Sequence, residues 1–146
     1  MLIMSNYYLV LSSNDYSETS EIYAENSADD FTIDLTETFV LSGAYECAIT
    51  YLYCEKKNNN IKNQLLYLFC DICVDSYIRE QRLPILKLFD NRVRADNNSL
   101  IQQYIPLKTN SFNKIRIYIR NSTLKPGTAS GLKFVSCVLH IRKSLV

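Results

Sequence analysis

The stretch "KIRIYIRN", residues 114–121, alternates apolar and polar side chains from Lys114 to Arg120. Its three isoleucines fall on one face, and Arg116, Tyr118 and Arg120 fall on the other. A period of two is typical of a β-strand with one buried face, because successive side chains of a strand point to opposite sides. The sequence therefore predicts a strand here whose isoleucines point into an apolar core.

The same alternation recurs along the chain, and no segment shows sustained helical spacing. Polar segments such as "EKKNNNIKNQ" (55–64) and "NSTLKPGTASG" (121–131) separate the apolar runs and indicate loops. We expect eight strands, at 6–12, 31–35, 44–54, 65–77, 83–89, 100–107, 114–120 and 132–142. Many short strands without helices are typical of an all-β sandwich or barrel.

The length and composition indicate one folded domain. A chain of 146 residues, with 47% hydrophobic and 21% charged residues, is long enough to close one hydrophobic core and too short to divide comfortably. Eleven tyrosines and six phenylalanines favour β structure. We therefore expect a single domain over residues 1–146.

Targeting signals are not found in the sequence. No apolar run approaches the roughly 20 residues that cross a bilayer, and the opening "MLIMSNYY" lacks the charged start and long apolar middle of a secretory signal. We expect a protein that is made inside the cell, has no membrane span and is not secreted through a signal peptide. Its five cysteines are an odd number without dense spacing, which favours reduced thiols over disulfides.

The net charge of +1 conceals an uneven distribution of charged residues. Residues 1–55 hold ten acidic side chains and no Lys or Arg, whereas residues 56–146 hold all sixteen bases and five acids. One interpretation is intramolecular, with two layers of one domain carrying opposite surface charge. The other is that the acidic face of one subunit meets the basic face of the next and steers their association. The acidic residues, which nearly equal the basic ones in number, argue against a dedicated nucleic-acid-binding protein.

Cys70 and Cys73 form a Cys-x-x-Cys pair, and Cys137 with His140 supplies a second pair with the spacing of zinc ligands. Residues three apart on a strand point to opposite faces, so each pair would grip one metal only if the backbone turned back between its members. We expect both pairs in strand interiors, with the thiols packed as small apolar side chains. A thioredoxin-like site would need a helix after Cys73, and none is predicted. The sequence thus predicts no metal site and no cofactor.

Catalytic patterns are not found either. His140 is the only histidine, and it falls on the polar side of the last predicted strand, where a surface or interface imidazole is expected. No Gly-rich phosphate loop occurs. The carboxylates are concentrated in an acidic loop and do not form a recognisable catalytic pair. "KIRIYIR" interleaves bases with an aromatic residue, as strands that bind nucleic acid do, but a single strand of this kind is a weak signal. We expect a protein that is not an enzyme.

The order of the predicted strands and their amino-acid sequences resemble those of a known group of proteins. The matching pieces cover nearly the whole chain: "YLVLSSNDYSE" (8–18), "ENSADDFTIDLTETFVLSGAYECAI" (25–49), "LYLFCDICVDSYI" (66–78), "LPILKLF" (83–89), "IRIYIRN" (115–121) and "FVSCVLHIRK" (134–143). The succession of "DFTIDL", a glycine and "YEC", with the closing "CVLHIR", is the most specific part. Together these segments resemble the minor capsid, or penton, proteins of Polinton/Maverick elements and adintovirus-like viruses.

The resemblance implies a single jelly-roll sandwich of two four-stranded antiparallel sheets. It also implies that the connections near 13–30, 55–64, 90–99 and 121–131 gather at one end of the sandwich. Proteins of this kind are similar in forming homopentamers at the fivefold vertices of icosahedral capsids, beside a double-jelly-roll major capsid protein. The implied location is the capsid vertex of the virion.

A ring of identical subunits uses heterologous contacts, and opposite charges on the two contacting patches favour its closure. We therefore predict that acidic residues of the first half meet bases of the second half across subunits. The candidate interface bases are Arg116, Arg120, Arg142 and Lys143. The alternative function is a free-standing β-sandwich binding module for nucleic acid or another protein.

Overall fold

The computed structural model describes residues 6–13, 26–92, 95–96, 103–125 and 130–144. The strands are β1 (Asn6–Ser12), β2 (Asp30–Val40), β3 (Tyr45–Lys56), β4 (Leu65–Cys70), β5 (Ser76–Ile78), β6 (Gln81–Leu83), β7 (Ile85–Asp90), β8 (Ala95–Asp96), β9 (Ile105–Pro106), β10 (Ser111–Arg120) and β11 (Leu132–Lys143). The described residues contain no helix that is long and apolar enough to span a membrane. The predicted all-β class is confirmed.

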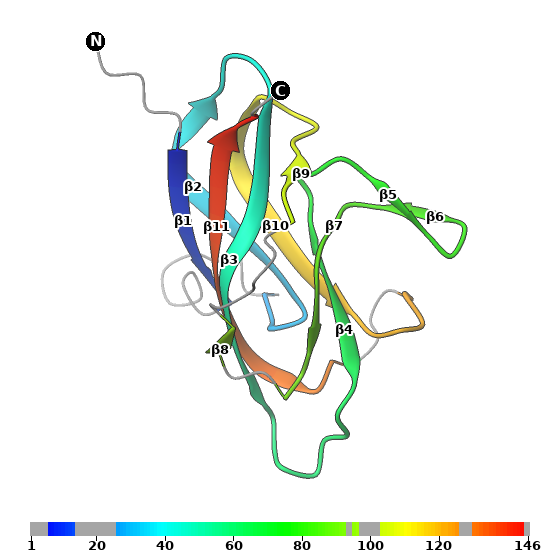
Figure 1. Cartoon of the computed structure of the whole chain (residues 1–146). Coiled ribbons are helices and arrows are strands. Elements are labelled where there is room, and N and C mark those ends of the chain that lie inside the picture. The colour runs from blue at the N-terminus through cyan, green and yellow to red at the C-terminus, as the bar shows by residue number, and fades with distance from the viewer. Residues whose placement is uncertain (1–5, 14–25, 93–94, 97–102, 126–129, 145–146) are drawn as a thin grey trace.

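The strands form two antiparallel sheets that pack face to face (Figure 1). Sheet A has the order β1-β11-β3-β8, and sheet B has the order β2-β10-β4-β7. The short strands β8 and β9 both pair with β3, at Leu52–Tyr53 and at Glu46–Cys47 respectively, so they share the fourth position of sheet A. Two four-stranded sheets with this interleaved strand order are a single jelly roll, which is the fold that the sequence resemblance implies.

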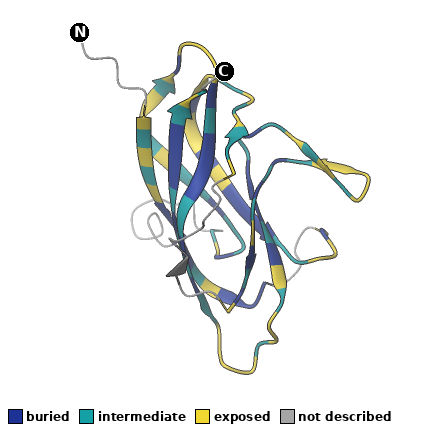
Figure 2. Ribbon diagram, in the orientation of Figure 1, coloured by how far each residue is buried: buried dark blue, intermediate teal, exposed yellow. Residues whose placement is uncertain are grey.

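The core lies between the sheets because the inward side chains of the strands are apolar. Figure 2 shows buried residues along strands of both sheets. In β10, Ile115 and Ile117 are fully buried, and in β11 the inward positions hold Val135, Leu139 and Ile141, all fully buried. These are the residues that the period-two pattern assigns to the inner faces. Their burial removes apolar surface from water, which is the main favourable term in folding.

The predicted strands over 6–12, 31–35, 44–54, 83–89, 114–120 and 132–142 correspond to β1, β2, β3, β7, β10 and β11. The predicted strand over 65–77 begins correctly with β4 but is too long, because β4 ends at Cys70 and the chain turns before the separate strand β5. Beyond the turn, the backbone finds new partners: Cys73 pairs with Leu107, and Val74 N donates to Pro106 O. The predicted strand over 100–107 contributes only β9 within the described residues.

The described parts of the four predicted connections meet at one end of the sandwich. Lys57 N donates to Gly131 O over 2.8 Å, and Gln64 Nε2 donates to Ser130 O over 3.2 Å. The Ser130 hydroxyl also donates to the carboxylate of Asp29. Asn91 N donates to Gln64 O over 3.1 Å, which ties the third connection, 90–99, to the second, 55–64. The predicted gathering of these loops is thus confirmed for the described residues.

A second, smaller apolar cluster lies on the outer face of sheet B. Its buried members are Phe69 of β4, Tyr118 of β10 and Leu124, which follows β10. The hairpin of β5 and β6 contributes Ile78 and Leu83, which pack against this cluster. One part of the outer face of sheet B is therefore covered by the chain itself.

Candidate functional site

Two of the four predicted interface bases, Arg116 and Arg120, lie on the outer face of sheet B. Arg116 forms a bidentate ion pair with Asp30 of β2, with nitrogen–oxygen distances of 2.9 and 2.7 Å. Arg120 donates to Leu124 O, and its guanidinium lies 4.9 Å from the centre of the Tyr118 ring. Both side chains also help to cover Tyr118, because Arg116 lies 4.5 Å from the same ring.

Arg142 lies on the outer face of sheet A, and Lys143 lies at the end of β11. Arg142 Nε is 3.3 Å from Oε1 of Glu46, and its guanidinium lies 3.4 Å from the centre of the Tyr104 ring. Lys143 is exposed, and no ion pair joins it to another described residue. The structure therefore distributes the four bases over both sheets and does not gather them into one patch.

The charge difference between the halves of the chain is partly neutralised within the subunit. Arg116 with Asp30, Arg142 with Glu46, and Lys133 with Glu55 each join a base of the second half to an acid of the first. The intramolecular interpretation of the charge pattern therefore accounts for these pairs. Contacts of the same bases across subunits stay a prediction.

His140 is almost buried on the outer face of sheet A, with 7% of its surface exposed. Its ring stacks on that of Tyr8 at 4.3 Å between centroids, with an interplanar angle of 2°. Nδ1 lies 2.7 Å from the Tyr104 hydroxyl and Nε2 lies 2.9 Å from Oδ1 of Asn6. Burial and then the nearby Arg142 charge lower the pKa of His140. These contacts hold a neutral imidazole that braces β1, β11 and the segment before β9.

Cys70 and Cys73 do not point to opposite sides of one strand, which corrects the sequence-based interpretation. The chain turns between them, with Cys73 N donating to Cys70 O over 3.1 Å, and both side chains are fully buried in the main core. The sulfur of Cys73 lies 3.2 Å from that of Cys47 in β3. Cys137 is inside the sandwich while His140 is on its outer face, so the second pair is divided as predicted.

All five cysteines are buried, and the pKa values of Cys54, Cys73 and Cys137 are raised. Burial raises the pKa of Cys137 to about 12, and burial together with the Asp90 charge raises that of Cys54 to about 11. The hydrogen bond with Cys47 raises the pKa of Cys73 still further. In the described part of the chain, which includes all five cysteines and His140, no group of three or more Cys, His, Asp or Glu residues could hold a metal ion.

A polar pocket of about 530 Å³ opens at the loop end of the sandwich. We call it the basic pocket; it is lined by Cys54, Glu55, Lys56, Lys57, Asn58, Asn59, Asn91, Arg92 and Lys133. Four of these side chains are cationic, and Glu55 is the one carboxylate. The sequence predicts only a polar loop at "EKKNNNIKNQ" and does not reveal this site, although the adjacent Lys56 and Lys57 are a signal for it.

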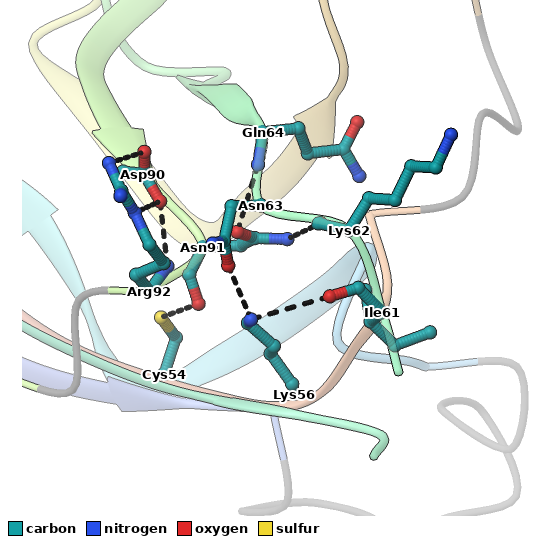
Figure 3. A network of polar contacts seen from close by, with 9 residues as sticks. All are labelled: Cys54, Lys56, Ile61, Lys62, Asn63, Gln64, Asp90, Asn91 and Arg92. Carbon is teal, nitrogen blue, oxygen red and sulfur yellow. Dashed lines mark hydrogen bonds and ion pairs between the residues drawn. The ribbon is translucent and has the colours of Figure 1, made fainter. Parts of the chain in front are cut away.

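A hydrogen-bond network fixes the walls of the basic pocket (Figure 3). Asn91, only 2% exposed, donates from Nδ2 to Lys62 O and accepts at Oδ1 from Gln64 N. Lys56 Nζ donates to Ile61 O and to Oδ1 of Asn63, over 3.4 and 2.5 Å. Arg92 pairs with Asp90, and this pairing lowers the pKa of the Asp90 carboxyl. The loop that carries the lysines is therefore held in one shape.

The fold and these surfaces define an all-β protein with a complete jelly roll, aromatic and basic side chains on both outer faces, and a basic pocket at its loop end. Comparison with known proteins adds no narrower identity. No protein-family model matches the sequence, and neither a curated protein nor a solved structure matches it.

Proposed function

We propose that the chain is the minor capsid, or penton, protein of an icosahedral particle, of the kind carried by Polinton/Maverick elements and adintovirus-like viruses. In this proposal it forms homopentamers at the fivefold vertices, beside a double-jelly-roll major capsid protein, and it catalyses no reaction. It is made inside the host cell and resides in the virion.

The observation that carries this proposal is the strand order, β1-β11-β3-β8 against β2-β10-β4-β7. A single jelly roll is the fold that the sequence resemblance implies, and jelly rolls are frequent in viral capsid proteins. The positions of the strands agree with that resemblance at both ends of the chain, in β1 and in β11.

The mass of the purified protein in solution tests the proposal. A penton protein is expected to give a particle of five times the 16.9 kDa of one chain, and fivefold rings in electron micrographs. Co-expression with the major capsid protein of the same genome should place the chain at the vertices of the particles. A protein that stays monomeric over a wide concentration range at low salt, and that is not found in particles, would contradict the proposal.

The alternative of a nucleic-acid-binding module rests mainly on the aromatic residue in "KIRIYIR", and the structure does not support that use of the residue. Single strands bind by stacking bases on exposed aromatic rings, but Tyr118 of "KIRIYIR" is only 8% exposed and stacks on Phe69 at 4.9 Å. A monomer that binds single-stranded oligonucleotides with steep salt dependence would revive this alternative. A monomer that binds another protein would support the protein-binding form of the module.

A further inference from the structure

We propose that the basic pocket at the loop end is a binding site for a small oligophosphate anion. The proposal does not depend on the penton function, because the pocket is formed within one subunit. Within the described part of the chain, it is lined by the 54–59 segment, Asn91, Arg92 and Lys133.

The charge of the lining selects an anionic ligand. Lys56, Lys57, Arg92 and Lys133 face one pocket, and Glu55 is the single acid among its described lining residues. Arg92 pairs with Asp90 and Lys133 with Glu55, so Lys56 and Lys57 carry the excess positive charge. A concave surface lined mainly by one sign of charge concentrates the field and attracts counter-ions into it. The excess of positive charge therefore favours a ligand with several negative charges.

Lys57 is the cation that is most available to such a ligand. Its side chain is exposed, and no ion pair joins it to another described residue. Lys133 Nζ is 3.5 Å from Glu55, with 58% of its side chain exposed, so it retains protons that point to solvent. An ammonium group donates up to three hydrogen bonds, and phosphate oxygens are strong acceptors for them.

The pocket is organised before any ligand binds. Lys57 is fixed at its backbone by the bond from its N to Gly131 O, and the loop that follows it is fixed by the buried Asn91. Gly131 is itself required here, because its φ of +76° is unfavourable for other residues and a Cβ would collide with the side chain of Ile61. A site that is already ordered loses less conformational entropy on binding.

The size and polarity of the pocket indicate the phosphate chain as the recognised group. A volume of about 530 Å³ lies within the range of small-ligand sites, roughly 300–1,000 Å³. The described residues that line it include no aromatic side chain on which a base could stack. Recognition therefore rests on the charges and oxygens of the ligand, which are the features of an oligophosphate.

Titration calorimetry with sodium tripolyphosphate at low salt tests the site. We expect saturable binding of one tripolyphosphate per chain, weaker binding of orthophosphate, and loss of affinity as salt is added. Lys57→Gln should weaken tripolyphosphate binding about tenfold because it removes one charge-assisted contact. Lys114→Gln makes the same charge change near the start of β10, away from the loop end, and should leave the affinity within about twofold.

Both variants change exposed residues, and thermal melting verifies that they remain folded. Equal affinities of Lys57→Gln and Lys114→Gln for tripolyphosphate, or the absence of saturable binding, would overturn the proposal. A single-stranded oligonucleotide is the third ligand in the titration. If it binds far more tightly than tripolyphosphate and depends equally on Lys57, the pocket recognises a nucleic-acid backbone and the oligophosphate proposal is wrong.

Discussion

His140 shows how one side chain can couple structure to pH. Its ring is enclosed by Tyr8, Tyr104 and Asn6, and the charged residue beside it is Arg142, whose own partner is Glu46. Burial and the Arg142 charge both disfavour the imidazolium form, so the pKa in the folded chain is lower than the ordinary value of 6.5. The unfolded chain therefore binds more protons than the folded chain just below pH 6.5.

We predict that stability falls as the pH falls below 6.5 through the lowered pKa of His140. Above that window the imidazole is neutral in both states, and its contribution to stability is fully present. Thermal melts of the wild type and of His140→Gln between pH 7.5 and pH 5 measure the effect. The melting temperature of the variant should change less over this range, because Gln does not titrate.

Carboxyl groups titrate in both proteins, so the difference between the two curves isolates His140. Parallel curves over the whole range would show that the imidazole does not contribute to the pH dependence. A lower melting temperature of the variant at every pH is compatible with the prediction, since Gln replaces a stacked ring that makes two hydrogen bonds.

The ion pair of Arg116 with Asp30 contributes little to stability, and it could not be predicted from the sequence. Its side chains are 46% and 48% exposed, so its contribution to stability is roughly 0.2–1 kcal/mol. The sequence shows that acids and bases are separated along the chain. It does not show that Asp30 and Arg116 lie on paired strands, because that depends on the register of β2 with β10.

At the scale of elements, the β5–β6 hairpin has a strained turn. Ile78 pairs with Gln81, so the turn has two residues, and Arg79 and Glu80 have φ values of 47° and 67°. Two-residue hairpin turns with positive φ at both positions favour Asn or Gly. Side chains with a Cβ are disfavoured there by roughly 1–2 kcal/mol each. The hairpin is nevertheless formed because Ile78 and Leu83 pack against the outer apolar cluster.

We predict that Glu80→Gly stabilises this hairpin by about 1 kcal/mol or slightly more, because glycine adopts positive φ without the Cβ penalty. Arg79 is retained, since its Nη1 donates to Ser122 O. Hydrogen exchange at the amides of β5 and β6 is the measurement, because a hairpin can open without global unfolding. Exchange should slow by about fivefold or more.

Glu80→Gln is the matched control for the loss of charge, and its exchange rates should equal those of the wild type. If glycine and glutamine at position 80 give the same exchange rates, the positive φ of Glu80 does not limit the stability of the hairpin.

The segment "LYLFCDICVDSYI" shows why some elements could be predicted and others could not. The strands with an uninterrupted alternation, β1, β10 and β11, lie where the sequence predicts them. The alternation does not reveal the turn after Cys70, because Cys70 before it, Ile72 within it and Cys73 after it are all buried, so the apolar pattern continues through it. What ends β4 is a contact with the distant 105–108 segment, including Lys108 N to Ile72 O. Local alternation carries no information about such a partner.

The basic pocket was missed for the same physical reason. A polar, lysine-rich loop is visible in the sequence, but its shape depends on Asn91 and Gly131, which are distant along the chain. Jelly rolls are dominated by such non-local pairings, which are fixed only when the whole sandwich closes.

The surface charges that remain after the internal ion pairs are formed determine how subunits can associate. Arg116 and Arg142 are engaged with Asp30 and Glu46, whereas Lys143 is exposed at the end of β11 without an ion pair to a described residue. Among the four predicted interface bases, Lys143 can therefore be changed with the least effect on the fold. It gives the sharpest test of the predicted ring contact.

In the proposed pentamer, Lys143→Glu should weaken association about tenfold, because it replaces an attraction to an acidic patch with a repulsion. The measurement is the concentration dependence of the mass in solution at two salt concentrations. Wild-type association should weaken as salt is added, and the difference between wild type and variant should shrink, because exposed charges are screened. Lys62→Glu makes the same change in the 55–64 loop and should leave the pentamer intact. If both variants assemble like the wild type, Lys143 does not lie at the subunit contact. The prediction that Lys143 meets an acidic patch of the neighbouring subunit is then wrong.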